Sequence, residues 1–102
     1  MTYPHQPDHI TLVITHGVRR DKLTEYESWL EKLMADAASF TGYQSVKILR
    51  PVHGETIYTV LVRFDNIDNL YQWIQSGQRE NREKTLANLL NGQEYIELRT
   101  QA

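Results

Sequence analysis

Arg63-Phe64-Asp65-Asn66-Ile67-Asp68-Asn69-Leu70-Tyr71-Gln72-Trp73-Ile74-Gln75-Ser76-Gly77-Gln78-Arg79 is the stretch that decides the fold. An apolar strand ends at its start, and the apolar residues that follow recur at i, i+3, i+4 and i+7: Ile67, Leu70, Tyr71 and Ile74. This spacing predicts one face of a helix. Asp65 is expected to be the N-cap, because an Asp side chain accepts from the first free amide groups. The stretch therefore leads from a strand into a short amphipathic helix that Ser76-Gly77 interrupts.

The residues before this stretch predict a β-hairpin. Residues 43–51 and 55–64 are rich in β-formers and are joined through Val52-His53-Gly54. In the second strand Ile57 and Leu61 point to one side, and a second apolar set points to the other: Tyr58, Val60, Val62 and Phe64. A strand with two apolar faces belongs to a sheet that is covered twice. Helices can cover one face, and in a chain this short a second copy of the chain is expected to cover the other.

The remaining elements follow from periodicity and from stop signals. Residues 9–18 alternate as a strand, and Asp21 is expected to cap a helix that runs to about Phe40, with Gly42 as its left-handed stop. Six polar residues of that helix are predicted to face water: Lys22, Glu25, Ser28, Lys32, Asp36 and Ser39. A second helical segment is predicted over residues 78–91, and a last strand over residues 94–99.

Together these elements predict an α+β fold of the ferredoxin-like type, a βαββαβ sandwich whose second helix is broken. Residues 1–8 read as a flexible N-terminal arm, and residues 9–102 as one domain. The uncovered apolar face of the sheet predicts a homodimer that packs sheet against sheet.

Composition excludes several classes of function. The 102 residues carry 11 basic and 13 acidic side chains, a net charge of −2, without a basic stripe or a polybasic run, so neither nucleic acid nor an anionic membrane is an expected partner. An RNA-recognition domain shares this topology, but the strand over residues 58–64 lacks its glycine and aromatic pattern. The apolar runs are too short for a membrane span, and no signal peptide is visible, which favours the cytoplasm.

Metal chemistry finds little support in the sequence. Cysteine is absent, and His5 and His9 stand four residues apart, but Pro4 and Pro7 argue against a helical histidine pair. Nucleotide-binding loops, nucleophile elbows and zinc-binding histidine spacings are also absent from the sequence. No metal site is predicted.

Three residues are candidates for a catalytic site. Asn69 and Trp73 are one helical turn apart at the edge of the apolar face, where they would form a pocket wall. In the alternative reading Trp73 is simply packed and Asn69 is solvated. His16 ends the first strand on its apolar side, where a neutral imidazole could bond a bound oxygen or serve as a core-edge residue with satisfied hydrogen bonds.

These residues also carry a family resemblance. Arg63-Phe64-Asp65, followed by a helical turn and by Trp73, Ser76 and Arg79, resembles the second half of an antibiotic biosynthesis monooxygenase domain. The first half agrees in the strand that ends near Val18, in a helix with Glu25, Tyr26, Trp29 and Leu30, and in Phe40-Thr41-Gly42. The resemblance covers roughly residues 9–99 and implies a dimeric α/β barrel.

The resemblance also implies a chemistry. Relatives include enzymes that oxidise aromatic phenols or hydroquinones with dioxygen, without metal, flavin or haem, because a deprotonated, electron-rich substrate can itself give an electron to oxygen. Such a protein needs a dry aromatic pocket with hydrogen-bond donors. Asn69 and Trp73 match the Asn and Trp that line this pocket in one branch, and His16 is the histidine placed to act as a base. A tyrosine that this branch carries a few residues later has no counterpart here.

Four further residues are expected around a bound ligand. Tyr26 and Trp29 would add aromatic lining from the first helix. Arg79 would hold an anionic oxygen or, equally, close the helix break with an ion pair, and Arg63 would make a salt bridge at the dimer edge or contact an anion. A haem-degrading branch needs a histidine in the second helical region, where this chain has none.

The competing hypothesis is a protein without catalysis: a small-ligand-binding or interaction dimer on the same scaffold. A fold does not determine a function. The ligand would again be a small aromatic molecule.

Overall fold

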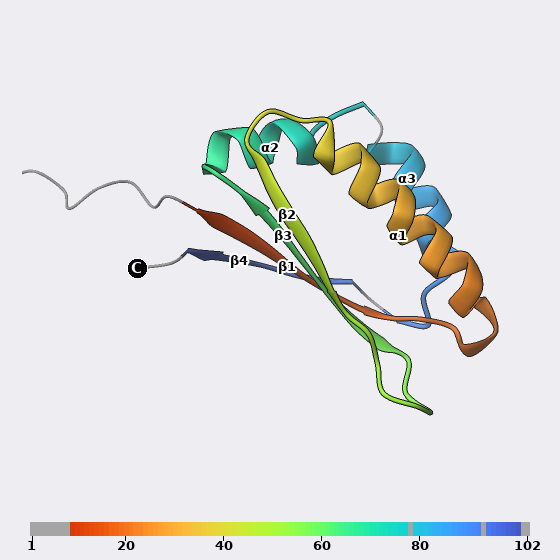
Figure 1. Ribbon diagram of the computed structural model, residues 1–102. Helices are drawn as coiled ribbons and strands as arrows, with labels where there is room; N and C mark the ends of the chain where they lie inside the picture. Colours follow the sequence, from red (N-terminus) through yellow and green to blue (C-terminus); the bar gives the residue numbers. More distant parts are fainter. Residues whose placement is uncertain (1–8, 78, 93, 101–102) are drawn as a thin grey trace, which may run out of the picture.

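The computed structural model describes residues 9–77, 79–92 and 94–100, which form a four-stranded sheet with helices on one face (Figure 1). In chain order the elements are β1 (Ile10–Gly17), a 3-10 turn (Arg20–Lys22), α1 (Leu23–Ala38), β2 (Tyr43–Leu49), β3 (Ile57–Phe64), α2 (Ile67–Ile74), α3 (Arg79–Ala87) and β4 (Tyr95–Thr100). The predicted arm, residues 1–8, lies outside the described residues.

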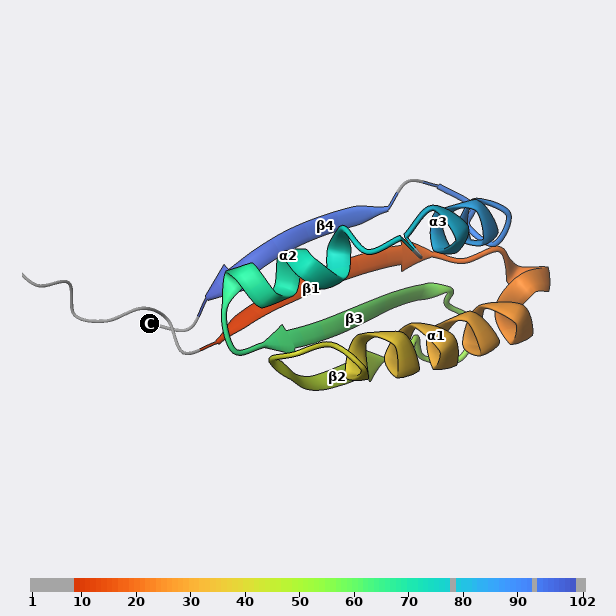
Figure 2. The same ribbon diagram turned by 90° about the horizontal axis from the view of Figure 1, so that it is seen from above.

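The sheet has the order β2-β3-β1-β4, and all neighbouring strands are antiparallel. Figure 2 shows α1 along the β2–β3 side of the sheet, and α2 and α3 along the β1–β4 side. This arrangement confirms the ferredoxin-like α+β fold with a broken second helix. No helix in the described ranges is both long and apolar enough to cross a membrane.

Strict alternation in β1 and β3 separates the two faces of the sheet. In β1, Ile10, Leu12, Ile14 and His16 are buried under the helices, while the residues between them stay half-buried on the open face. In β3 the predicted division holds, with Tyr58, Val60, Val62 and Phe64 buried and Ile57 59% exposed. The helices thus cover one apolar face of the sheet, and the described residues leave the other face uncovered.

The start of α1 differs from the prediction. Asp21 does not cap the helix; it lies in the 3-10 turn, and the N-cap position is Lys22, whose side chain makes no capping bond. The Lys22 amide donates to the Arg19 carbonyl oxygen at 2.8 Å, so the chain is already turning when the α-helix begins. This tighter turn replaces the side-chain cap that the sequence suggested.

The cap of α2 is also displaced by one residue. Asn66, not Asp65, is the N-cap, with extended backbone and a side-chain oxygen 2.9 Å from the Asn69 amide nitrogen. The Asp65 carboxylate instead accepts from the Asn69 side chain at 2.8 Å. Gly42 lies against this pair with φ of +87°, and a Cβ there would be 2.3 Å from Asp65 Oδ1. The predicted left-handed glycine is confirmed, and it also makes room for the Asp65–Asn69 contact.

The second helical segment ends earlier than residue 91. After Ala87 the chain pairs with the end of β1: the Arg19 amide donates to the Leu89 carbonyl oxygen at 2.8 Å, and the Asn91 amide to the Gly17 carbonyl oxygen at 2.9 Å. Leu89 and Leu90 are nonetheless buried. The spacing of these leucines therefore predicted their burial correctly. The predicted helix over residues 88–91 was wrong, because Leu89 and Asn91 make hydrogen bonds with the end of β1 and the residues after it instead.

Candidate functional site

A cavity of about 270 Å³ lies between the β1–β4 side of the sheet and the three helices. Its lining is mostly apolar, with charged groups at a few positions: Leu12, Ile14, Trp29, Leu33, Tyr71, Trp73, Ile74, Arg82, Glu83, Leu86, Glu94, Ile96 and Leu98. An apolar cavity with a few polar groups is the usual form of a small-molecule site, although this one is small for the class. The residues involved come from β1, β4 and all three helices.

Trp73 forms part of the cavity wall. Its side chain is only 2% exposed and stacks on Phe64, with ring centroids 5.9 Å apart. The indole N–H donates to Asp36 Oδ2 at 3.3 Å, and the Arg82 guanidinium lies 5.3 Å from the ring centroid. These contacts fix the indole on several sides, while the cavity borders it on another.

Asn69 does not line this cavity. Its side-chain amide donates to Asp65, and its backbone amide donates to the Asn66 side chain. These bonds tie the start of α2 to the turn at Gly42. Asn69 and Trp73 are therefore one helical turn apart, as the sequence indicated, but only Trp73 reaches the cavity.

His16 is completely buried and is held at both ends. Its Nδ1 is 2.6 Å from the Tyr26 hydroxyl oxygen, and its Nε2 is 2.7 Å from Glu94 Oε2. Burial raises the pKa of the Tyr26 phenol well above its ordinary value, so this phenol stays protonated. Within the described part of the chain, Nδ1 is the only hydrogen-bond partner of that hydroxyl. We therefore assign the hydroxyl as donor and Nδ1 as acceptor, which leaves the Nε2 proton to be donated to Glu94.

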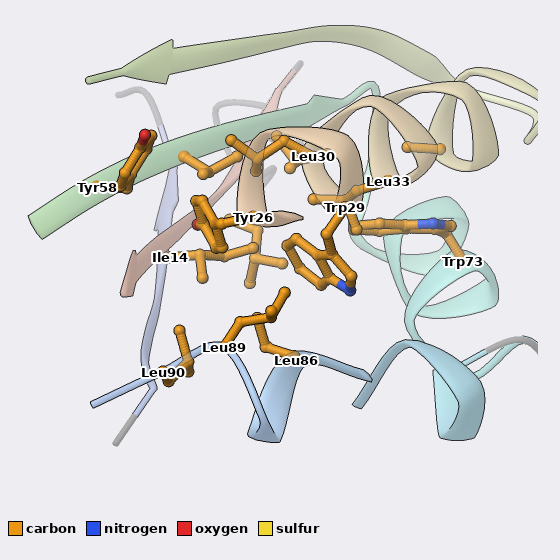
Figure 3. Close-up of a cluster of buried hydrophobic side chains, with 14 of the residues drawn as sticks. Ile14, Tyr26, Trp29, Leu30, Leu33, Tyr58, Trp73, Leu86, Leu89 and Leu90 are labelled. Carbon is orange, nitrogen blue, oxygen red and sulfur yellow. The ribbon is translucent and has the colours of Figure 1, made fainter. Parts of the chain in front are cut away.

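The two aromatic residues predicted to line the site have different positions. Trp29 borders the cavity, and its indole N–H donates to the Arg82 carbonyl oxygen at 3.2 Å. Figure 3 shows it reaching from α1 toward Leu86 of α3. Tyr26 is buried behind it, with the two rings stacked at 5.7 Å. Tyr26 therefore does not line the cavity, but it contacts two residues near it, His16 and Trp29.

Of the two predicted arginines, Arg63 does not line the cavity. Arg63 belongs to β3 and points to the open face of the sheet, on the side away from the helices. Its Nε is buried without a hydrogen-bond partner among the described residues. Arg79 begins α3, but its side chain lies outside what the structure describes.

Three charged residues of the site were not identified from the sequence. Asp36 was expected to face water, and this was wrong: its side chain is 11% exposed and pairs with Arg82, which is 16% exposed. Asp36 follows Trp29 by seven positions and Leu33 by three, which placed it on the buried side of α1, and that spacing was the available signal. Arg82 had the same kind of signal, because it precedes Leu86 by four positions and Leu89 by seven. Glu94 had no such signal, because only the tertiary fold brings it to His16.

A second, outer hollow of about 550 Å³ lies between α1 and α3. Trp29, Leu33 and Arg82 line both spaces, so these three side chains separate the inner cavity from the outer groove. No group of three or more His, Cys, Asp or Glu side chains suited to hold a metal occurs within the described ranges.

Comparison with known families identifies the family of the chain. The model of the antibiotic biosynthesis monooxygenase family matches residues 9–85, which is most of the chain. The chain belongs to this family. A search of curated proteins gives no match.

Solved structures agree with the fold of this antibiotic biosynthesis monooxygenase domain. SnoaB, a cofactor-independent oxygenase from Streptomyces nogalater, is 19% identical with a TM-score of 0.83, over 93% of this chain and 94% of that one. A conserved protein from Methanosarcina mazei Go1 is 18% identical, with a TM-score of 0.83 over 92% and 93%. The protein Rv0793 from Mycobacterium tuberculosis is 13% identical, with a TM-score of 0.81 over 92% and 95%. At these identities the likeness establishes the fold.

Proposed function

We propose that this protein is a cofactor-independent monooxygenase that oxidises a small aromatic phenol or hydroquinone with dioxygen in the cavity beside Trp73. The observation that carries the proposal is the cavity itself, walled by two indoles and by aliphatic side chains. In the proposed reaction the bound ligand displaces water from these apolar walls, and the ionised phenol is electron-rich enough to reduce oxygen directly. Membership of the antibiotic biosynthesis monooxygenase family and the fold shared with SnoaB support this reading.

Of the residues predicted from the sequence, Trp73 and His16 have the strongest geometric support. Trp73 is fixed by Phe64, Asp36 and Arg82 and borders the cavity, so a planar ligand would meet a rigid wall. His16 meets the cavity through Glu94 rather than directly. Asn69 would need to break its bond to Asp65 to take part.

The test is oxygen uptake by purified protein with a panel of hydroquinones and anthrones. We expect substrate-dependent uptake that falls roughly tenfold or more in Trp73→Phe, because a smaller ring leaves the substrate poorly positioned. Asn69→Ala is the matched comparison on the same helix. It should lower the free energy of unfolding by about 1 kcal/mol through its lost contact with Asp65 and change uptake less than Trp73→Phe does.

The alternative is a non-catalytic small-ligand-binding or interaction dimer on this scaffold. One observation favours it: Asn69, half of the pair that the family resemblance placed in the pocket, is engaged with Asp65 instead. Ligand binding without oxygen uptake across the panel, or uptake that Trp73→Phe leaves unchanged, would support this alternative.

We also propose that two copies of the chain pair through the open faces of their sheets. On this face Val13 and Leu61 are half-buried and Ile57 is 59% exposed, and they form an apolar strip among polar neighbours that no helix of the described residues covers. Sedimentation analysis should give a dimer for the wild type and a monomer for Leu61→Glu. Val52→Glu, in the exposed hairpin, is the control and should stay dimeric. A monomeric wild type in dilute solution would contradict the proposal.

A further inference from the structure

Glu94 is the carboxylate through which the buried His16 reaches the cavity. It stands immediately before β4 and lines the cavity, and its side chain is 29% exposed while His16 is fully buried. The His16–Glu94 contact joins residues 78 positions apart in the sequence. This contact therefore gives the largely apolar cavity a hydrogen-bond acceptor in a fixed place.

The orientation of His16 makes Glu94 an acceptor rather than a donor. Because the Tyr26 hydroxyl donates to Nδ1, the Nε2–H of His16 is directed at Glu94 Oε2. A carboxylate that receives such a bond at one oxygen keeps its second oxygen to accept from another group. Within the described residues, His16 is the hydrogen-bond partner of the Glu94 side chain.

We propose that Glu94 selects the ligand by accepting a hydrogen bond from an aromatic hydroxyl group, and that during oxidation it takes the proton of that hydroxyl. The second part rests on the proposed function; the first does not. His16 is a positioning residue, since it fixes the carboxylate without touching the ligand. In the transfer the phenol O–H bond breaks, a new O–H bond forms on the carboxylate, and the electron pair stays on the phenolate oxygen. The phenolate then gives one electron to dioxygen, which is reduced to superoxide.

The charges around the cavity define the ligand class. Besides Glu94, α3 contributes Glu83 and Arg82, and Arg82 is paired with Asp36. His16 from β1 and Tyr26 from α1 stand behind Glu94 and donate toward it in sequence. The Glu94 carboxylate in this lining disfavours an anionic ligand beside it and favours a neutral one that donates a hydrogen bond. The expected ligand is an uncharged phenol, not an aromatic acid.

The competing explanation is purely structural: Glu94 would only tie the start of β4 to the core through His16. A structural tie would alter stability when Glu94 is changed, but it would not distinguish two ligands that differ in one hydroxyl group. The test therefore compares 2-naphthol with 2-methylnaphthalene, which share a ring system and differ by hydroxyl against methyl.

Dissociation constants for both probes are measured by equilibrium dialysis at neutral pH, where 2-naphthol is uncharged, so no oxidation is needed. The wild type should prefer 2-naphthol by roughly tenfold to hundredfold, the value of a hydrogen bond to a charged group. The preference should fall to a few-fold in Glu94→Gln, a neutral acceptor, and vanish in Glu94→Leu. Glu31→Gln, an exposed carboxylate on α1, controls for the lost charge and should keep the full preference.

The outcomes separate this inference from the proposed function. A Glu94-dependent preference without oxygen uptake on any hydroquinone supports the selecting role and overturns the oxidase. Oxygen uptake with equal preferences in the wild type and Glu94→Leu overturns the role of Glu94 and leaves the oxidase standing. A wild type that binds neither probe, or binds both equally, also overturns the inference.

Discussion

Two polar clusters border the same cavity, and they differ in what they leave available. In the first, Asp36, Arg82 and Trp73 satisfy one another: the carboxylate pairs with the guanidinium and accepts from the indole, and the guanidinium lies over the ring. In the second, Tyr26 and His16 form a chain that ends at Glu94, whose side chain is 29% exposed. Asp36 and the Trp73 indole bond within the first cluster, which we call the closed cluster, whereas the second cluster ends at the cavity.

This difference distinguishes polar residues that stabilise the fold from polar residues that can contact a ligand, although both lie in the same small core. A nearly buried ion pair is costly to break because either partner alone is left charged in a low-dielectric site. A chain of neutral donors is cheaper to change, and its last member can exchange a protein or solvent contact for a ligand. The comparison predicts that substitutions of Asp36 and Arg82 act mainly on stability, and that substitution of Glu94 acts mainly on ligand selection.

The largest expected effect comes from breaking the closed cluster. Arg82→Met should lower the free energy of unfolding by about 3 kcal/mol, because it leaves Asp36 charged at 11% exposure and removes the cation above Trp73. Urea unfolding followed by tryptophan fluorescence measures the change.

The double variant Asp36→Leu/Arg82→Met is the control for this experiment. It removes both charges, and we expect it to recover more than half of the stability lost in Arg82→Met, since an apolar pair needs no compensation. If Asp36→Leu/Arg82→Met is as unstable as Arg82→Met, then the loss of stability comes from the missing ion pair between α1 and α3 and not from an unpaired buried charge on Asp36.

A smaller effect on stability is expected in the second cluster, the hydrogen-bonded series Tyr26–His16–Glu94. Tyr26→Phe removes the hydroxyl that donates to His16 Nδ1 and should lower the free energy of unfolding by about 1–2 kcal/mol, the value of a buried acceptor left unpaired. Nitrogen NMR of the imidazole should show the Nε2–H tautomer in both proteins, because Glu94 still accepts from Nε2. Tyr43→Phe is the control, since the Tyr43 hydroxyl has no hydrogen bond within the described part of the chain. A wild type with the proton on Nδ1 would contradict the assigned direction of hydrogen-bond donation from Tyr26 to His16 and from His16 to Glu94.

The sequence predicted the covered and open faces of the sheet well, because burial in strands follows a period of two that is visible in residues 9–18 and 55–64. The same local reasoning placed Gly42 and the helix break correctly. It failed at the caps, where Asn66 and the 3-10 turn before α1 took the positions expected for Asp65 and Asp21. Neighbouring residues that can each cap a helix differ by too little for sequence alone to choose between them.

The site was predictable only as far as its residues belong to one element. Trp73 follows from the pattern of α2, and His16 from the alternation of β1. Glu94 did not stand out, because its meaning arises from a contact with His16 across 78 positions. Asp36 was misassigned because its charge was given more weight than its position on the helix, although a buried partner, Arg82, removes the cost of that charge.

The smallest effect is expected at a third polar cluster, which lies outside the cavity. Its ion pair is exposed to solvent, so it should contribute less to stability than the nearly buried Asp36–Arg82 pair. The Arg50 guanidinium donates to Glu27 at 2.8 and 2.9 Å, and the Tyr58 hydroxyl donates to the same carboxylate at 2.8 Å. Arg50 is 56% exposed and Glu27 35% exposed, so Arg50→Met should cost less than about 1 kcal/mol at neutral pH.

The contribution of this third cluster to stability depends on pH, and the pKa shifts of Glu27 and Tyr58 give the direction of that dependence. The hydrogen bond from Arg50, and then that from Tyr58, lowers the pKa of Glu27 below its ordinary value, so its contribution to stability is present above that value and is lost as the pH falls through the lowered pKa. Burial, followed by the bond to Glu27, raises the pKa of Tyr58 to about 12, so the neutral phenol stabilises the fold below its ordinary pKa near 10 and loses this effect as the pH rises through about 12. The stability difference between the wild type and Arg50→Met, measured by urea unfolding across pH, should therefore shrink in acid. A difference that stays constant through the acid range would show that Arg50 contributes by packing and not by its charge.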